Sequence, residues 1–281
     1  MSARRQLQQR LRSLGEMQEI LGSMKTLAVL ETHKLARFGA NQQRLVMGIE
    51  RAAADFCQSF PHALKRTLPV FAEVYLLLGS ERGFCGDFNE GLLIKLTEVQ
   101  QQHTGQNVLV LAIGSRLWVK LANDPRVIAR LNGPSATEEV PAVLIQVIDT
   151  LLDLENQFHS LRLTVLCHDP ETQQVVQHPL LPPFTAFAER LPALGPPPSI
   201  NLPPQQLFSE LVEHYLFATL HALFYTALDV ENQRRIQHLE AATRRLEEKI
   251  TQLTLRANTL RQEEITEEIE VILLSAQERR T

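Results

Sequence analysis

The sequence predicts an α/β head inserted between two long N- and C-terminal helices that pair as an antiparallel coiled coil. All 15 prolines lie between Pro61 and Pro204, and the last of the 12 glycines is Gly195. Because proline and glycine interrupt helices, both ends of the chain are free to form long ones, while the middle is built of shorter elements. The expected domains are residues 1–60 for the first helix, 61–204 for a Rossmann-like head with its Pro-rich connector, and 205–281 for the second helix.

The first arm repeats apolar residues at a strict spacing of seven, which places them on one stripe of a helix. Its expected seam comprises Leu7, Leu14, Leu21 and Leu35, with Ala28 between them. In the second arm apolar residues alternate at spacings of three and four. Its expected seam comprises Ile236, Leu239, Leu246, Ile250, Leu253 and Leu260.

Neither arm is expected to be stable alone in water, but each can bury its stripe on the other if the head reverses the chain direction. Each buried Leu or Ile then contributes on the order of 1.5–3 kcal/mol. In this pairing Met24 is expected near Leu246–Ile250. An ordinary helical bundle is the alternative, because its amphipathic helices show similar stripes.

The second arm is longer than the first by about 20 residues, so about 30 Å of single helix should project past the pair. In the expected tip, apolar side chains lie around most of the helix circumference, so the tip needs an enclosing partner. Its residues are Ile269, Val271, Ile272, Leu273 and Leu274. Alternatively, the tip folds back on the head or frays.

The head shows short apolar runs typical of buried strands, separated by helical segments, which favours a mainly parallel sheet. Strands are expected at Val74–Leu78, Val108–Ile113 and Leu161–Cys167, and helices at Phe88–Gln102 and Glu138–Glu155. The stretch Pro179–Pro204 is expected to be an extended connector to the second arm, because three consecutive prolines cannot lie within a helix or a central strand.

Composition excludes several function classes. With 28 Lys and Arg against 32 Asp and Glu, the chain does not resemble a basic nucleic-acid binder, and we expect no nucleic-acid partner. It shows no apolar run that could span a bilayer and no signal-peptide pattern, so no direct membrane insertion is expected. Its three scattered cysteines match neither a disulfide framework nor a zinc site.

The turn Gly79–Gly86, after the first strand, has the position of a phosphate-binding loop but lacks the P-loop and dinucleotide fingerprints. We therefore predict no catalytic residue, cofactor or metal in this chain. An enzyme with a site at Cys85, Asp87 and Asn89 stays open as an alternative, although a packed turn cysteine is the simpler interpretation. His214 and His221 are interpreted as packing or surface residues.

The turn Arg82–Asn89, Arg-Gly-Phe-Cys-Gly-Asp-Phe-Asn, resembles the Arg-Gly-Leu-Cys-Gly-Gly-Leu-Asn motif of the gamma subunit of F-type rotary ATP synthases; Arg82, Gly83, Cys85, Gly86 and Asn89 match. The second arm is similar over its length, including Arg261, Gln262, Ile265 and Thr266. The first arm matches more sparsely: Glu19 and Gly22 stand where the family has lysines, and Arg244 and Arg245 replace its Asp/Asn pair, as in a divergent branch of the N-ATPase type.

This resemblance implies a non-catalytic rotor shaft. Its partners would be the alpha and beta subunits of a catalytic hexamer, the epsilon subunit and the c-ring, at the cytoplasmic face of the cell membrane. Arg261 and Gln262 would contact a beta subunit. The heptads alone would also allow a non-rotary coiled-coil scaffold protein with an α/β head.

Overall fold

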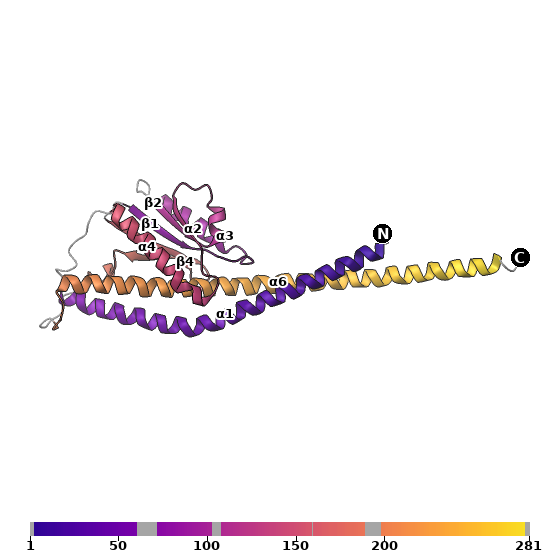
Figure 1. Cartoon of the computed structure of the whole chain (residues 1–281), viewed down its shortest axis with the longest axis horizontal. Coiled ribbons are helices and arrows are strands. Elements are labelled where there is room, and N and C mark those ends of the chain that lie inside the picture. The colour runs from indigo at the N-terminus through magenta and orange to yellow at the C-terminus, as the bar shows by residue number, and fades with distance from the viewer. Residues whose placement is uncertain (1–2, 61–71, 103–107, 159, 189–197, 279–281) are drawn as a thin grey trace. The chain divides into compact units, whose positions relative to one another are not determined.

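A computed structural model of the chain describes residues 3–60, 72–102, 108–158, 160–188 and 198–278. It divides into two compact units, one of residues 29–235 and one in which residues 1–28 join residues 236–281. A long N-terminal helix and a long C-terminal helix flank a small α/β sheet domain, which confirms the predicted fold class (Figure 1). The elements are α1 (Ala3–Ser59), β1 (Ala72–Leu78), α2 (Phe88–Gln102), β2 (Val108–Ile113), α3 (Ser115–Lys120), β3 (Val127–Leu131), η2 (Thr137–Glu139), α4 (Val140–Phe158), β4 (Leu161–His168), β5 (Val175–Leu181), α5 (Thr185–Ala188) and α6 (Pro204–Glu278).

The head contains a five-stranded sheet in the order β3-β2-β1-β4-β5. Strand β1 is central and pairs in parallel with both neighbours, as in Leu76 opposite Leu111 and Val165. Among the described strands, only the β4–β5 pair is antiparallel. Every residue of β1 is buried, because helices cover both faces of the sheet, as parallel sheets require.

Two apolar cores lie on the two faces of the sheet. One contains Leu76 and Leu111 of the sheet, Leu144 of α4 and Phe224 of α6, all less than 3% exposed. The other contains Leu77, with Phe88 and Leu92 of α2 and Leu117 of α3. The long helix α6 thus forms part of the head's core and is not merely attached to it.

Within the same unit, α1 and α6 run in opposite directions. Phe56 packs on Phe208 with ring centroids 6.0 Å apart, and Phe38 packs on Tyr225 at 5.9 Å. Since residue numbers rise along one helix as they fall along the other, the two helices are antiparallel.

The second unit shows the same orientation through polar pairs. Arg4 pairs with Glu264 at 2.9 Å, and Lys25 pairs with Glu240 at 2.8 Å. The register differs from the expected one, because Lys25 lies opposite Glu240 and Met24 is therefore not placed against Leu246–Ile250. A seven-residue repeat determines which stripe of each helix is buried, but not which residues of the two helices lie opposite each other.

Helix α6 continues from Glu264 to Glu278, beyond the residues that pair with the first turn of α1. The described projecting part is therefore about 20 Å long, shorter than expected, because the pairing register is shifted. Side chains at its described end are exposed: Ile269 by 51% and Val271 by 65%.

Four head elements were not predicted: the helices α3 and α5 and the strands β3 and β5. The edge strands are half-exposed and show no apolar run; β3 alternates between half-buried and exposed residues. Pro179 lies inside β5, so the prediction of an extended connector from Pro179 was wrong over its first part. An edge strand tolerates proline because its outer side has no neighbouring strand to which a backbone N–H would have to donate.

Candidate functional site

The turn after β1 runs from Ser80 into the start of α2 and is held by hydrogen bonds between Ser80 and Asn89. The Ser80 amide donates to Asn89 Oδ1 at 3.0 Å, and Asn89 Nδ2 donates to Ser80 Oγ at 2.8 Å. Phe84 has a φ of 64° and Gly86 a φ of 62°. A bulky residue in this left-handed region costs on the order of 1–2 kcal/mol, so surrounding contacts must hold Phe84 there.

Helix α6 supplies those contacts through Glu231. One carboxylate oxygen accepts from the Arg82 amide at 3.2 Å, and the other accepts from the Glu81 amide at 3.4 Å. Glu231 is only 4% exposed. A buried carboxylate thus joins the long helix to two consecutive backbone amides of the turn.

Arg235, one helical turn further, completes this contact. Its guanidinium pairs with Glu231 and donates through Nε to the Gly83 carbonyl at 3.2 Å. It also donates to Asn232 Oδ1 at 2.6 Å and to Cys85 Sγ at 3.4 Å. We call the contacts of Glu231 and Arg235 with the turn the head joint.

Both charged groups of the head joint are buried, so each must compensate the charge of the other. Burial raises the pKa of Glu231, and Arg235 and the two amide donors oppose that rise. Removing one partner of a buried ion pair typically costs about 3–5 kcal/mol, because the other charge is left uncompensated. The pair therefore fixes one geometry between α6 and the turn.

Glu81 ties the joint to the rest of the sheet edge. Its Oε2 accepts from the Ser115 amide at 2.9 Å and from the Gly133 amide at 2.7 Å. These two residues follow β2 and β3, respectively. One carboxylate therefore connects the loops after three neighbouring strands.

Helix α1 holds the head at a second place. Glu31 Oε2 accepts from the Thr137 amide at 3.0 Å and from its hydroxyl at 2.9 Å, and Lys34 bridges Glu31 and Glu138 at 2.9 Å each. Burial alone would raise the pKa of Glu31, but the hydrogen bonds from Lys34 and Thr137 lower it below its usual value. Both long helices thus hold loops of the head through polar contacts.

The expected seam residues are all buried or half-buried. Leu35, Leu239 and Leu253 are buried; the half-buried ones are Leu7, Leu14, Leu21, Ile236, Leu246, Ile250 and Leu260. Leu35 lies in the unit of residues 29–235, and the others in the second unit.

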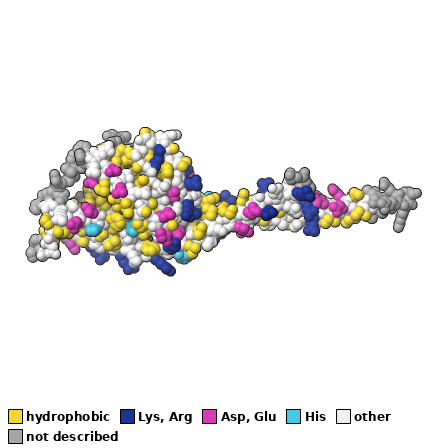
Figure 2. All heavy atoms as spheres, viewed as in Figure 1, with side chains coloured by type: hydrophobic (Ala, Val, Ile, Leu, Met, Phe, Trp, Pro, Cys, Tyr) yellow, Lys and Arg dark blue, Asp and Glu magenta, His cyan; other side chains and the backbone are white. Residues whose placement is uncertain are grey.

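Residues toward the end of α6 are exposed, including Arg261, Gln262, Ile269, Val271 and Ile272. Figure 2 shows hydrophobic side chains beside acidic ones in this part of the helix. Leu273 and Leu274 belong to the helical backbone of α6, but their side chains lie outside the described residues.

The arrangement around Cys85 does not favour nucleophilic chemistry. The thiol is 5% exposed, and burial, with the nearby Glu231 charge, raises its pKa to about 12. The reactive species is the thiolate, which this environment suppresses. Asp87 instead pairs with Arg234 at 3.5 Å, and Asn89 holds the turn.

No group of three His, Cys, Asp or Glu residues that could hold a metal occurs among the described residues.

The two histidines singled out from the sequence are on α6. His214 is exposed, and His221 packs on Tyr225 with centroids 4.6 Å apart. A third histidine, His168, is 3% exposed and stacks on Phe88 at 4.0 Å. Burial lowers its pKa to about 4, with Arg234 adding to the decrease and Asp87 opposing it.

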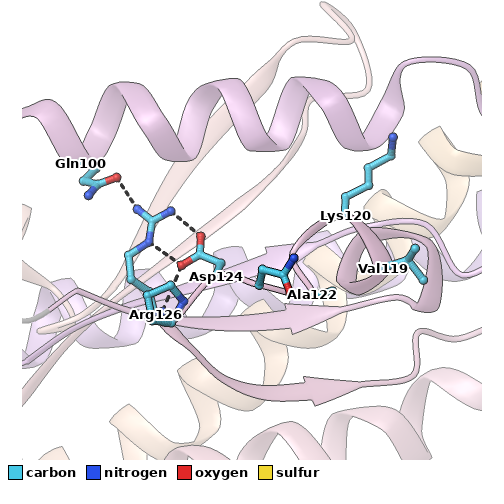
Figure 3. Close-up of a pocket in the computed structure, with 8 residues that line it drawn as sticks. Gln100, Val119, Lys120, Ala122, Asp124 and Arg126 are labelled. Atoms are coloured by element: carbon cyan, nitrogen blue, oxygen red, sulfur yellow. Dashed lines mark hydrogen bonds and ion pairs between the residues drawn. The ribbon is translucent and has the colours of Figure 1, made fainter.

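A surface groove of about 660 Å³ lies beside α3 (Figure 3). Its charged side chains are paired: Arg126 pairs with Asp124 at 2.5 Å and donates to Gln100, and Lys120 pairs with Glu90 of the neighbouring helix α2 at 2.6 Å. The groove therefore offers no uncompensated charge to a ligand.

None of the helices described in the structure is long and apolar enough to cross a membrane.

Sequence reasoning missed Glu231 and Arg235. A signal was present, because an acidic and a basic residue four apart interrupt an apolar stretch of α6. Such pairs are usually solvated, and only the packing of α6 on the sheet edge shows that this one is buried.

Two long antiparallel helices joined to an α/β head by buried polar contacts define a stalk protein. The model of the ATP synthase family matches residues 3–277. The chain belongs to the ATP synthase gamma subunit family.

Among curated relatives, the ATP synthase gamma chain of Clostridium botulinum (strain Hall) is 25% identical over 219 residues, covering 74% of this chain and 73% of that one. The gamma chain of Parafrankia sp. (strain EAN1pec) is 24% identical and covers 96% of this chain and 95% of its own.

Solved structures with a similar fold are also ATP synthase assemblies. The OSCP/F1/c-ring structure of Euglena gracilis mitochondrial ATP synthase in rotational state 3 aligns with a TM-score of 0.59 at 13% identity, covering 98% of this chain and 93% of the other. The central stalk/c-ring of the Tetrahymena thermophila mitochondrial enzyme aligns with a TM-score of 0.56 at 14% identity, covering 79% and 99%.

Proposed function

We propose that this chain is the rotor shaft of an F-type ATP synthase. In this role it couples ion-driven rotation of a membrane c-ring to ATP synthesis or hydrolysis in an alpha/beta hexamer. The observation that carries the proposal is the antiparallel pairing of two long helices, one of which continues as an exposed single helix. Family membership and the fold shared with central stalks support it.

In this proposal residues 1–60 and 205–281 form the shaft, and residues 61–204 form the head. The seam leucines and isoleucines give the shaft stiffness, since a helix pair twists less than a single chain. Catalysis belongs to the partner subunits, and the shaft contributes no reacting group and binds no cofactor.

The exposed end of α6 would turn inside the hexamer. Apolar contact has no preferred direction, so Ile269, Val271, Ile272, Leu273 and Leu274 would meet a surrounding sleeve without strong directional bonds. Arg261 and Gln262 would contact a loop of a beta subunit, where a guanidinium can form a charge-assisted bond to a carboxylate. The exposure of Arg261 and Gln262 is consistent with such contacts.

The head would contact the c-ring and an epsilon subunit at the cytoplasmic face of the membrane, as a peripheral part of the complex. The coupling ion, H+ or Na+, would be selected by membrane subunits. The turn Arg82–Asn89 would help to hold the head on the shaft through the head joint.

Single-molecule rotation tests the proposal. Val119 is 72% exposed on α3, so a Val119→Cys variant can carry a bead while the chain is assembled with immobilised alpha and beta subunits. ATP should drive unidirectional rotation, and removal of ATP should stop it. A chain that forms no complex with these subunits would favour the scaffold alternative.

A second experiment addresses the tip. Changing Ile269 and Val271 to Asp should leave the stability of the isolated chain nearly unchanged, because both side chains are exposed. The same change should weaken assembly with the hexamer. Thr266→Asp, which adds a charge without removing an apolar group, is the matched control. Unchanged assembly and ATP hydrolysis in the double variant would remove the bearing role.

A further inference from the structure

The sheet of the head has the geometry of a ligand-binding sheet. The chain leaves β1 through α2 toward β2 and returns through α4 to β4, on the other side of β1 (Figure 1). In open α/β sheets, ligands bind outside the carboxyl ends of the strands where the strand order reverses. In this sheet that place lies beyond Leu78 of β1 and His168 of β4.

Consecutive backbone amides make an anion-binding feature at that place. The N–H groups of Glu81 and Arg82 both point at one carboxylate, that of Glu231, at 3.4 and 3.2 Å. Successive N–H groups in a turn form a concavity that favours negative charge. The Arg235 guanidinium, 4% exposed, adds a positive charge to the same oxygen that Arg82 contacts.

We propose that this turn is an anion-binding site whose ligand is supplied by the chain itself, the Glu231 carboxylate of α6. In a nucleotide-binding sheet of this topology a phosphate group would lie at this position; here the Glu231 carboxylate occupies it. The site therefore does not accept a nucleotide while α6 is in place. The free energy of the contact between Glu231 and the turn instead holds α6 on the head.

The side chain that fills the site suggests a direct test. Glu231→Ala removes a CH₂–COO⁻ group, which acetate matches in size and charge, and alanine keeps the helix intact. We expect the melting temperature of the full-length Glu231→Ala chain to fall and acetate to raise it again. By mass action a ligand that binds only the folded state raises stability with its concentration, here by about 2–6 °C near saturation.

Two controls make the test specific. Acetamide has the shape of acetate without its charge and should not restore the variant, and chloride at equal ionic strength should not either. Glu231→Gln keeps the volume but loses the charge; it should be less stable than the native chain and insensitive to acetate, since no space is vacated.

Several outcomes would overturn the proposal. Equal stabilisation of Glu231→Ala by acetate and by acetamide would do so, as would stabilisation of the native chain by acetate to the same extent as the variant. Should Glu231→Ala remain unfolded in every buffer, Glu231→Gln decides: native-like stability of that variant would show that no anion is required. This result is independent of the rotor function, because every measurement uses the isolated chain.

Discussion

Gly79, the residue after β1, lies directly against Leu117 of α3: a Cβ atom on Gly79 would be 2.4 Å from the Cβ of Leu117. Real Cβ atoms do not approach so closely, and Leu117 is completely buried, so it has no room to move. Glycine at this position therefore allows α3 to pack on the sheet edge that carries the head joint.

Gly79→Ala should accordingly destabilise the chain by about 1–3 kcal/mol, the usual cost of overpacking a core. The urea midpoint of unfolding measures the effect. Gly48→Ala is the matched control, because Gly48 is helical and has nothing within 4 Å of an added Cβ. That variant should gain about 0.5–1 kcal/mol from helix propensity. Equal effects of both substitutions would contradict the packing argument.

The register of the two long helices can be checked with a zero-length carbodiimide crosslinker. It should join the Lys25 amine to the Glu240 carboxylate, which lie 2.8 Å apart, and peptide mass spectrometry should identify this link. Lys25→Arg, which retains the charge but does not form the amide, is the control. A link from Lys25 to Glu247 or Glu248 instead would support the register originally expected for Met24.

His168 should make stability depend on pH. Its pKa of about 4 lies below the value of about 6.5 expected in the unfolded chain, so the unfolded state binds the proton first. The stabilisation is complete above about pH 6.5 and is lost as the pH falls toward 4, with about 1–2 kcal/mol disappearing between pH 7 and 5.

Comparison with His168→Phe isolates this contribution, because phenylalanine retains a ring that can stack on Phe88. As the pH is lowered, the native chain should lose stability relative to His168→Phe. The difference in unfolding free energy between the two chains should therefore shrink or change sign in favour of the variant. His178 and His221 also have lowered pKa values and are present in both chains. Parallel pH profiles for the two proteins would disprove the assignment.

Cys85 provides a test against the enzyme alternative. With a pKa of about 12, the folded thiol is almost entirely protonated near pH 8 and should react slowly with iodoacetamide. All three cysteines are free and buried, so labelling should become rapid only after unfolding. Fast labelling of Cys85 in the native chain, together with a soluble activity lost in Cys85→Ala, would revive the enzyme interpretation.

Much of the head was predictable because buried strands have long apolar runs. The helix expected at Phe88–Gln102 has those bounds, and the strand expected at Val108–Ile113 does as well. Strand β5 was missed, since only one of its seven residues is fully buried and Pro179 argues against a strand. Its formation depends on pairing with β4, a contact that no local pattern records.

The candidate site was predicted only in part. The turn Arg82–Asn89 stood out by its glycines and its resemblance to a family motif, yet its binding partner did not. Glu231 and Arg235 look like a common solvent-facing pair in the sequence. Their burial follows from the packing of α6 across the sheet edge, a contact between residues far apart in the sequence.

The amino-acid sequence by itself determined the long helices, the α/β character of the head and the family, because these depend on local periodicity, on the placement of proline and glycine, and on motifs. Tertiary structure alone decided the helix register, the edge strands and the head joint. These depend on which surfaces meet across large sequence separations, where packing and the need to pair buried charges select one arrangement from several that the local pattern permits.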